Sequence, residues 1–263
     1  MDRVAVTFNQ LKSEGRPGLV LFLTAGFPDR NATLELVPAL AEVGADIIEL
    51  GVPFSDPLAD GVTIQASNNL ALDQGVTLRD CIDMVRHLRN LVPSTPLLLM
   101  GYFNPILSYG LECFASDVQE VGVDGVIVVD LPEEEAAPLR SELSSRGVHL
   151  IPLLAPNSTD ERIKQACMNA SGFIYCISLT GVTGSREEVP SGAFSLVNRV
   201  RQHTAVPVVV GFGISSREHV QAVCREAEAA VVGSALIRTI AESPRDLVLS
   251  KARRFVSELC GLN

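Results

Sequence analysis

Apolar runs recur along the chain and are separated by stretches with helical periodicity. Each run is rich in aliphatic and β-branched residues and lacks polar alternation, which is typical of parallel strands covered on both faces. The runs span residues 18–26, 45–51, 96–104, 125–132, 149–156, 172–179, 207–213 and 229–236. Eight strands that alternate with helices over one domain length predict an α/β fold, a single (β/α)8 TIM barrel spanning residues 1–263.

Several helices between these runs have recognisable starts. One is predicted to begin at Thr77, and Ser215 with Glu218 is predicted to form the capping box of another. Extra helices are predicted before the first run and over 245–259, one covering the bottom of the barrel and the other closing its ring of helices. The alternative is a doubly wound sheet with a dinucleotide site, but "GFGISS" at 211–216 lacks the third glycine of that motif.

Charge and composition exclude several classes of function. With 31 acidic and 21 basic residues the formal net charge is −10, which argues against nucleic-acid binding. No apolar run reaches the length of about 18 residues that a membrane span needs, and the start lacks the apolar core of a signal peptide. The six cysteines are scattered without a C-x-x-C pair. These features predict a cytoplasmic protein that does not bind a membrane.

A carboxylate lies near the end of the second apolar run and is followed by a loop with two prolines and two aspartates, "ELGVPFSDPLAD" at 49–60. In a barrel this end of the strand faces the active site. Apolar surroundings raise the pKa of a buried glutamate, so Glu49 is a candidate general acid/base. Asp60 is a candidate acceptor for a substrate N–H. The alternative is a structural glutamate paired with an arginine.

Glycines gather near the ends of the last three runs, in "TGVTG" (180–184), "GFG" (211–213) and "GSA" (233–235). Backbone N–H groups can approach an anion there, as in barrels that bind phosphate, although glycines also simply end strands. None of the three lysines lies at a strand end, and no cluster has metal-ligand spacing, so neither Schiff-base nor metal chemistry is expected. Cofactor-free acid/base chemistry on a phosphorylated substrate remains. The predicted pocket wall is Phe22, Met100, Tyr102, Ile127, Val129, Leu153, Tyr175 and Phe212.

Five motifs together resemble the tryptophan synthase α subunit family over nearly the whole chain: "ELGVPFSDPLADG" with a following "IQ", "YFNPI", "GVDGVIVVDLPEEE", "GVTG" and "GFGIS". The resemblance implies a (β/α)8 barrel that cleaves indole-3-glycerol phosphate to indole and glyceraldehyde 3-phosphate by a retro-aldol reaction. It implies that Glu49 is the acid/base, that Asp60 holds the indole N–H, and that Tyr175 is a catalytic-site residue beside Glu49. The implied phosphate site and its mobile loop comprise Gly184, Gly213, Gly233, Ser234 and Thr183.

The same resemblance implies a β-subunit partner in an α2β2 assembly. Pyridoxal phosphate would belong to that partner, and this chain is expected to hold no cofactor or metal. The implied docking surface is Pro53, Phe54, Asp56, Pro57, Asn104, Leu131 and Pro132. The sequence departs from the family pattern at Val62, where proline is usual, and at Leu70, where arginine is usual. The alternatives are a stand-alone indole-3-glycerol-phosphate lyase, a sugar-phosphate isomerase or epimerase, and a non-catalytic chain that stimulates a β subunit.

Overall fold

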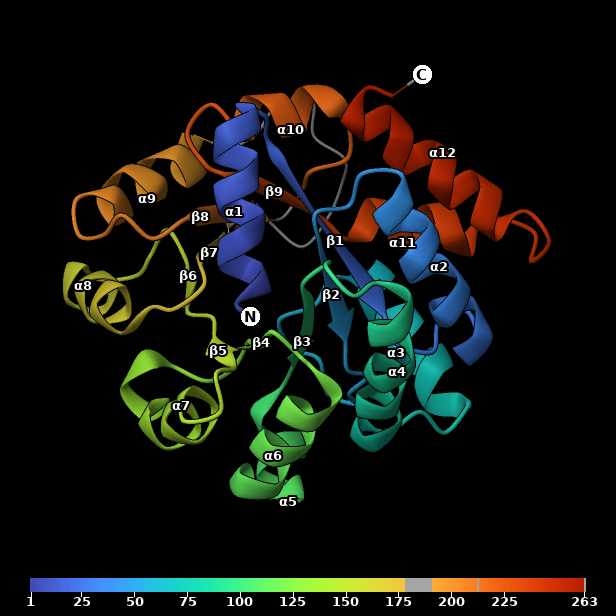
Figure 1. Ribbon diagram of the computed structural model, residues 1–263, viewed down its shortest axis with the longest axis horizontal. Helices are drawn as coiled ribbons and strands as arrows, with labels where there is room; N and C mark the ends of the chain where they lie inside the picture. The colour runs from blue at the N-terminus through green and yellow to red at the C-terminus, as the bar shows by residue number, and fades with distance from the viewer. Residues whose placement is uncertain (178–190, 212, 263) are drawn as a thin grey trace.

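The chain folds into a barrel of parallel strands surrounded by helices, as the apolar runs predict (Figure 1). The computed structural model describes residues 1–177, 191–211 and 213–262, those at 191–193 by their backbone. The strands are β1 (Gly18–Thr24), β2 (Ile47–Gly51), β3 (Leu97–Gly101), β4 (Gly125–Val128), β5 (His149–Leu150), β6 (Leu153–Leu154), β7 (Ile174–Ile177), β8 (Val208–Gly211) and β9 (Ala229–Val232). Each predicted run contains at least one of these strands.

The sheet closes through the fifth predicted run, which forms the two short strands β5 and β6. The strand order is β5-β4-β3-β2-β1-β9-β8-β7-β6. β5 pairs with β4 and β6 pairs with β7, and Ile151 and Pro152 join them. The Ile151 N–H donates to the Val126 carbonyl (2.9 Å), and the Tyr175 N–H donates to the Pro152 carbonyl (3.0 Å). Because Pro152 has no N–H to donate, the regular ladder is interrupted there without opening the barrel.

The helices form the outer layer around the strands. They are α1 (Arg3–Glu14), α2 (Arg30–Glu42), α3 (Val62–Asp73), α4 (Leu78–Leu91), α5 (Phe103–Tyr109), α6 (Leu111–Val121), α7 (Ala137–Ser144), α8 (Asp160–Asn169), α9 (Ser191–Arg201), α10 (Arg217–Val223), α11 (Ser234–Ala241) and α12 (Val248–Cys260), with the 3-10 helix η1 (Glu133–Glu135) before α7. α12 packs between α2 and α11 and so closes the ring, as predicted for the last helix.

Helix starts follow the sequence signals with one correction. Thr77 caps α4 as predicted: its hydroxyl accepts the Asp80 N–H (3.2 Å), and the Asp80 carboxylate accepts the Thr77 N–H (2.8 Å). The predicted cap of α10 at Ser215 is wrong by one residue. Ser216 has the extended backbone that an N-cap needs, and its hydroxyl accepts the His219 N–H (3.3 Å).

Apolar clusters fill both sides of the strands. Side chains on the outer faces, such as Leu21 and Ile48, pack beneath the helices. Inner-face side chains, among them Val20, form a second cluster that also contains Phe8 and Leu11 of α1. α1 therefore fills one end of the barrel, as predicted for the helix before the first strand.

A buried carboxylate fixes α1 at that end. Asp124 directly precedes β4, so it marks the N-terminal ends of the strands. Its oxygens bind Arg3 of α1 (3.0 Å) and Arg89 of α4 (2.7 Å), and one of them also accepts the Leu97 N–H (2.8 Å). Since a buried charge is costly without partners, this network ties α1 to the bottom of the barrel and leaves the opposite end for the active site.

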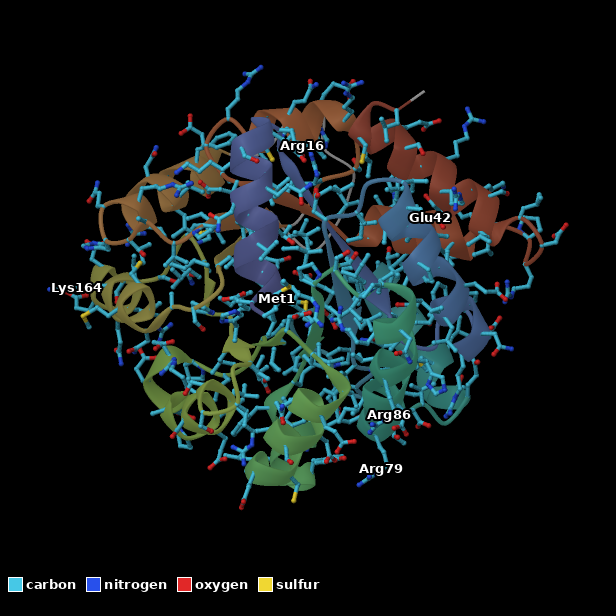
Figure 2. All side chains as sticks on the ribbon, viewed as in Figure 1. Met1, Arg16, Glu42, Arg79, Arg86 and Lys164 are labelled. Carbon is cyan, nitrogen blue, oxygen red and sulfur yellow. The ribbon has the colours of Figure 1, made fainter. Side chains whose placement is uncertain are left out.

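Charged side chains lie mainly on the periphery, where Arg86 and Lys164 project from the outer helices (Figure 2). All six cysteines are free thiols, and Cys81, Cys167 and Cys176 are buried. Within the described ranges, no helix combines the length and the apolar character that crossing a membrane requires.

Candidate active site

Glu49 lies on the inner face of the barrel, near the C-terminal end of β2. All five residues of β2 are buried, and Glu49 pairs in register with Phe22 of β1 and Leu98 of β3. Its side chain is 0% exposed, and neither carboxylate oxygen has a hydrogen-bond partner among the residues that the structure describes. The alternative of a structural glutamate paired with an arginine therefore has no support in the described part of the chain.

Burial without a partner controls the protonation of Glu49. Removal from water disfavours the charged carboxylate and raises its pKa to about 8. Tyr175, on the inner face of β7, is also buried. Its pKa is raised well above the ordinary value, first by burial and then by the negative charge of Glu49. The two side chains are therefore close enough to interact.

Two strand-end glycines make room for the aromatic rings of this region. A Cβ on Gly51 would lie 2.4 Å from Cζ of Phe22, and a Cβ on Gly211 would lie 2.2 Å from the Tyr175 hydroxyl. Both distances are far shorter than carbon contacts in a packed interior. Packing therefore explains these two glycines, in line with the plainer interpretation of glycines at strand ends.

The loop after β2 is held against the end of β3 by Tyr102. The rings of Phe54 and Tyr102 stack with their centroids 5.1 Å apart, and the Tyr102 hydroxyl accepts the Ala59 N–H (3.1 Å). The half-buried Asp60 accepts a hydrogen bond from Asn68 Nδ2 (3.2 Å). Burial raises the pKa of Asp60 to about 6, while hydrogen bonds from Tyr102 and Asn68 oppose that rise.

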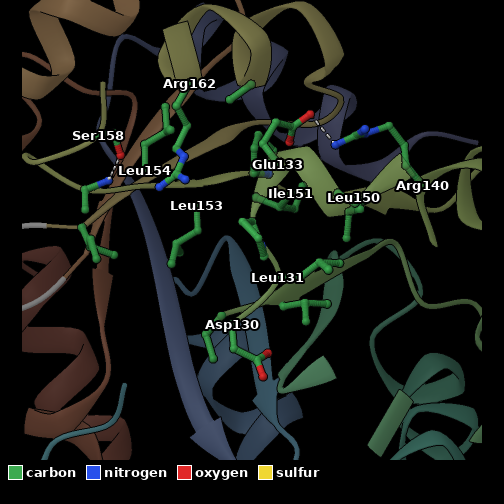
Figure 3. A pocket seen from close by; sticks show the side chains of 18 of the residues that line it. Asp130, Leu131, Glu133, Arg140, Leu150, Ile151, Leu153, Leu154, Ser158 and Arg162 are labelled. Atoms are coloured by element: carbon green, nitrogen blue, oxygen red, sulfur yellow. Dashed lines mark hydrogen bonds and ion pairs between the residues drawn. The ribbon is translucent and has the colours of Figure 1, made fainter. Parts of the chain in front are cut away.

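A cavity of about 410 Å³ lies at the C-terminal ends of β4 to β7, next to α7 and α8 (Figure 3). Two residues of the predicted pocket wall, Val129 and Leu153, line it together with Leu131 and Pro132 of the predicted docking surface. The two candidate catalytic carboxylates do not line it. The cavity therefore borders the predicted substrate pocket on one side and the helix layer on the other.

Of the remaining predicted wall residues, those that the structure describes lie on the inner face of the barrel or at its rim. Phe22 and Ile127 are buried, and Met100 is half-buried. Tyr102 is buried with its hydroxyl directed at the loop after β2. Phe212 lies outside the described residues.

Part of the predicted phosphate site lies at the start of α11. Gly213 has a φ of 76°, a backbone conformation that favours glycine. Gly233 is the N-cap of α11, and the exposed Ser234 is its first residue. The first N–H groups of a helix have no partner within the helix and suit an anion. Thr183 and Gly184 lie outside the described residues.

The residues of the predicted docking surface differ in exposure: Asp56 and Asn104 are exposed, Phe54, Leu131 and Pro132 are half-buried, and Pro53 and Pro57 are buried. Sequence reasoning missed Leu58 in the same loop, which is 95% exposed. It also missed Ser67 and Asn68, which are buried polar residues of α3. The polar "SNN" at 67–69, just after the "IQ" motif, was the available signal. In the described ranges, no three His, Cys, Asp or Glu side chains gather as metal ligands.

Comparison with known proteins identifies the family of the chain. The family model described as "Tryptophan synthase alpha chain" matches residues 8–259. The tryptophan synthase alpha chain of Roseiflexus sp. (strain RS-1) is 48% identical over 261 residues, which cover 99% of this chain and 100% of that relative. A solved tryptophan synthase subunit alpha from Legionella pneumophila is 33% identical with a TM-score of 0.90, covering 100% of this chain and 98% of the other. A chain of the tryptophan synthase complex from Pyrococcus furiosus is 42% identical with a TM-score of 0.86, covering 93% and 98%. The chain belongs to the tryptophan synthase alpha chain family, the lyases that cleave indole-3-glycerol phosphate in tryptophan biosynthesis.

Proposed function

We propose that Glu49 is the acid/base, and Asp60 the partner of the indole N–H, when this chain cleaves indole-3-glycerol phosphate. One observation carries the proposal. The Glu49 carboxyl is buried at the end of β2 without a partner among the described residues, and its pKa is raised to about 8. A carboxyl that stays protonated near neutral pH can donate a proton to a carbon atom, which an ordinary glutamate cannot do efficiently.

The reaction follows from these two carboxyl groups. Glu49 donates its proton to the indole ring carbon that bears the glycerol side chain, and the ring becomes cationic. Asp60 accepts the ring N–H and stabilises that charge. The bond between the ring and the side chain then breaks, and its electron pair restores the indole ring. The side-chain hydroxyl becomes the aldehyde carbonyl and its proton passes to Glu49, which ends in the state in which it began.

The other residues of the site position the substrate. Tyr175 packs beside Glu49, and the apolar inner face of the barrel excludes water from the indole. The phosphate is proposed to bind at the start of α11, at Gly233 and Ser234, and at Gly213 after β8, with Gly184 and Thr183 completing the site. A helix N-terminus attracts an anion through its unpaired N–H groups and its dipole, so this end of the barrel is suited to the phosphate.

We also propose that the chain works with a β subunit in an α2β2 assembly in the cytoplasm, and that pyridoxal phosphate belongs to that subunit. A solved neighbour is described as a tryptophan synthase complex, and relatives matched over nearly their whole length are named alpha chains, which favours this arrangement over a stand-alone lyase. Asp56, within the loop after β2, and Asn104, in the first turn of α5, are exposed, which suits a docking surface.

Indole release from indole-3-glycerol phosphate tests the assignment of Glu49. Glu49→Gln is expected to lower the turnover rate by a factor of about 100 to 10,000, the usual contribution of a general acid/base. Calorimetry should show that the variant still binds the substrate. Glu226→Gln changes an exposed glutamate next to β9 and is the matched control. A Glu49→Gln enzyme that keeps most of its activity would falsify the proposal. Repeating the assay with a β subunit tests the partner, because a stand-alone lyase would gain nothing from it.

A further inference from the structure

Three side chains hold the end of the β2 loop. The Tyr102 hydroxyl accepts the Ala59 N–H (3.1 Å), and Gln65 Nε2 donates to the Asp60 main-chain carbonyl (2.8 Å). Asn68 Nδ2 donates to Asp60 Oδ2 (3.2 Å). The Asp60 carboxylate thus accepts an amide N–H from Asn68, in addition to its hydrogen bond with the Tyr102 hydroxyl.

The position of Asn68 is fixed by its neighbour on α3. Asn68 is 3% exposed, and a buried amide is costly unless it is hydrogen-bonded. Ser67, which is 1% exposed, lies 2.6 Å from the Thr24 hydroxyl at the end of β1, oxygen to oxygen, and its own hydroxyl also donates to the Ile64 carbonyl (2.8 Å). α3 is therefore attached to the barrel at the residue next to Asn68, so that Asn68 reaches Asp60 from a rigid support.

We propose that Asn68 is a positioning residue for the cleavage reaction, one that orients the Asp60 carboxylate and favours its charged form. The inference rests on the proposed role of Asp60. An amide suits this task because it donates a hydrogen bond and carries no charge. It stabilises the carboxylate without forming the ion pair that would neutralise it before the cationic ring develops.

The surroundings of Asp60 give this hydrogen bond a measurable effect. Burial raises the pKa of Asp60 to about 6, close enough to neutral pH for a further rise to matter. The two groups that oppose the rise are the hydroxyl of Tyr102, at the end of β3, and the amide of Asn68, on α3. Both are uncharged. Burial and then the negative charges of Asp60 and Asp130 raise the pKa of the Tyr102 hydroxyl, which therefore stays protonated. Loss of the amide therefore leaves Asp60 protonated over more of the working pH range.

The test is the pH profile of kcat/KM for indole release by the full chain with its β subunit. Asn68→Ala is expected to move the acidic limb upward by about one pH unit, because a hydrogen bond to a charged group is worth about that much. The loss is then about fivefold at pH 6, approaches tenfold below pH 5 and becomes small by pH 8. Asn69→Ala removes the exposed amide of the next residue on α3 and is the matched control. The acidic limb of its kcat/KM profile should stay at the wild-type pH.

A second variant covers the case in which Asn68→Ala does not fold. Asn68→Asp keeps the size of the side chain, removes the donor and adds a like charge, so its acidic limb should move further than that of the alanine variant. An acidic limb that stays at the wild-type position in Asn68→Asp, or an equal loss at every pH, refutes the inference. Asp60→Asn distinguishes an error in the proposed role of Asp60 from an error in the proposed role of Asn68. If Asp60→Asn itself keeps full activity, the role of Asp60 is wrong and the inference fails with it. If Asp60→Asn is inactive while the Asn68 variants leave the limb unmoved, only the role of Asn68 is wrong.

Discussion

Replacing Glu49 by glutamine is expected to stabilise the folded chain as the pH rises, although it removes catalysis. Glu49 is fully buried and has no hydrogen-bond partner among the described residues, so its charged form is strongly disfavoured in the folded state. In the unfolded chain the same carboxyl is in water and ionises freely. Folding at neutral pH must therefore bind a proton to Glu49, and glutamine has no proton to bind.

The size of this effect follows from the two pKa values. Burial raises the pKa of Glu49 from 4.5 to about 8. Below pH 4.5 Glu49 is protonated in both the folded and the unfolded chain, and its contribution to the free energy of unfolding is at its most favourable. Between 4.5 and 8 only the folded state holds the proton, so the free energy of unfolding falls by about 1.4 kcal/mol per pH unit. That amounts to about 3 kcal/mol at pH 7 and about 5 kcal/mol once the pH passes the folded-state pKa.

Urea titrations of both proteins at pH 5, 6, 7 and 8 measure this difference. The free energy of unfolding of Glu49→Gln should exceed that of the wild type by an amount, here called the gap, that grows steadily over that pH range. A buried glutamine amide adds a constant that does not depend on pH, so the slope and not the offset is the test. Glu226→Gln, at an exposed site, should run parallel to the wild type. A gap that is equal at pH 5 and pH 8 would show that burial does not raise the pKa of Glu49, and the acid/base argument would lose its basis.

Three further results are expected. The profile of kcat/KM against pH should be bell-shaped, with an acidic limb near pH 6, where Asp60 must be ionised, and a basic limb near pH 8, where Glu49 must be protonated; indole release from pH 5 to 9.5 measures it. Gly211→Ala should lower the melting temperature by about 5 °C in calorimetry, because its Cβ would overlap the Tyr175 hydroxyl. Asp124→Ala should lower the free energy of unfolding by about 3 to 5 kcal/mol in urea titrations, since it leaves the half-buried Arg3 and Arg89 without their buried partner.

Two of these results have a control variant in the same chain, and the pH profile has a contradicting outcome. A flat pH profile would contradict the assignment of the two limbs. Gly61→Ala should leave the melting temperature almost unchanged, because Gly61 has a φ of −75° and nothing within 4 Å of a Cβ. Arg254 is 82% exposed and pairs with Glu258 one turn away, so Arg254→Ala should change the stability by less than about 0.5 kcal/mol. An equal effect of Arg254→Ala and Asp124→Ala would refute the argument from burial.

The strands could be predicted from the sequence because burial on both faces leaves a clear local pattern. β1 is buried at every one of its seven positions, and the other apolar runs also contain strands. The break between β5 and β6 was less visible, although Pro152 is its cause. The cap of α10 was misplaced because two serines stand side by side at 215 and 216, and only the backbone geometry distinguishes them.

The candidate site was predictable where one short segment carries it and not where distant segments meet. Glu49 and Asp60 belong to a single motif, and the position of Glu49 at the end of an apolar run indicates its burial. Asn68 gave no comparable signal, because its importance depends on the distance between α3 and the β2 loop. The glycines show the same limit: Gly51 and Gly211 serve packing and Gly213 serves a backbone angle, which composition alone cannot separate.

Stability and catalysis make opposite demands on β2. An arginine beside Glu49 would form a buried ion pair and lower the pKa of the carboxyl, and the folded chain would no longer lose stability as the pH rises. The same arginine would leave Glu49 ionised at neutral pH, without a proton to donate to the substrate. The apolar neighbours Phe22 and Leu98 have the reverse effect, because they keep the proton on Glu49 and make folding less favourable at neutral pH. The buried apolar faces of the other strands and the network around Asp124 supply the stability that this arrangement needs, and they lie away from the C-terminal end where the substrate is proposed to bind.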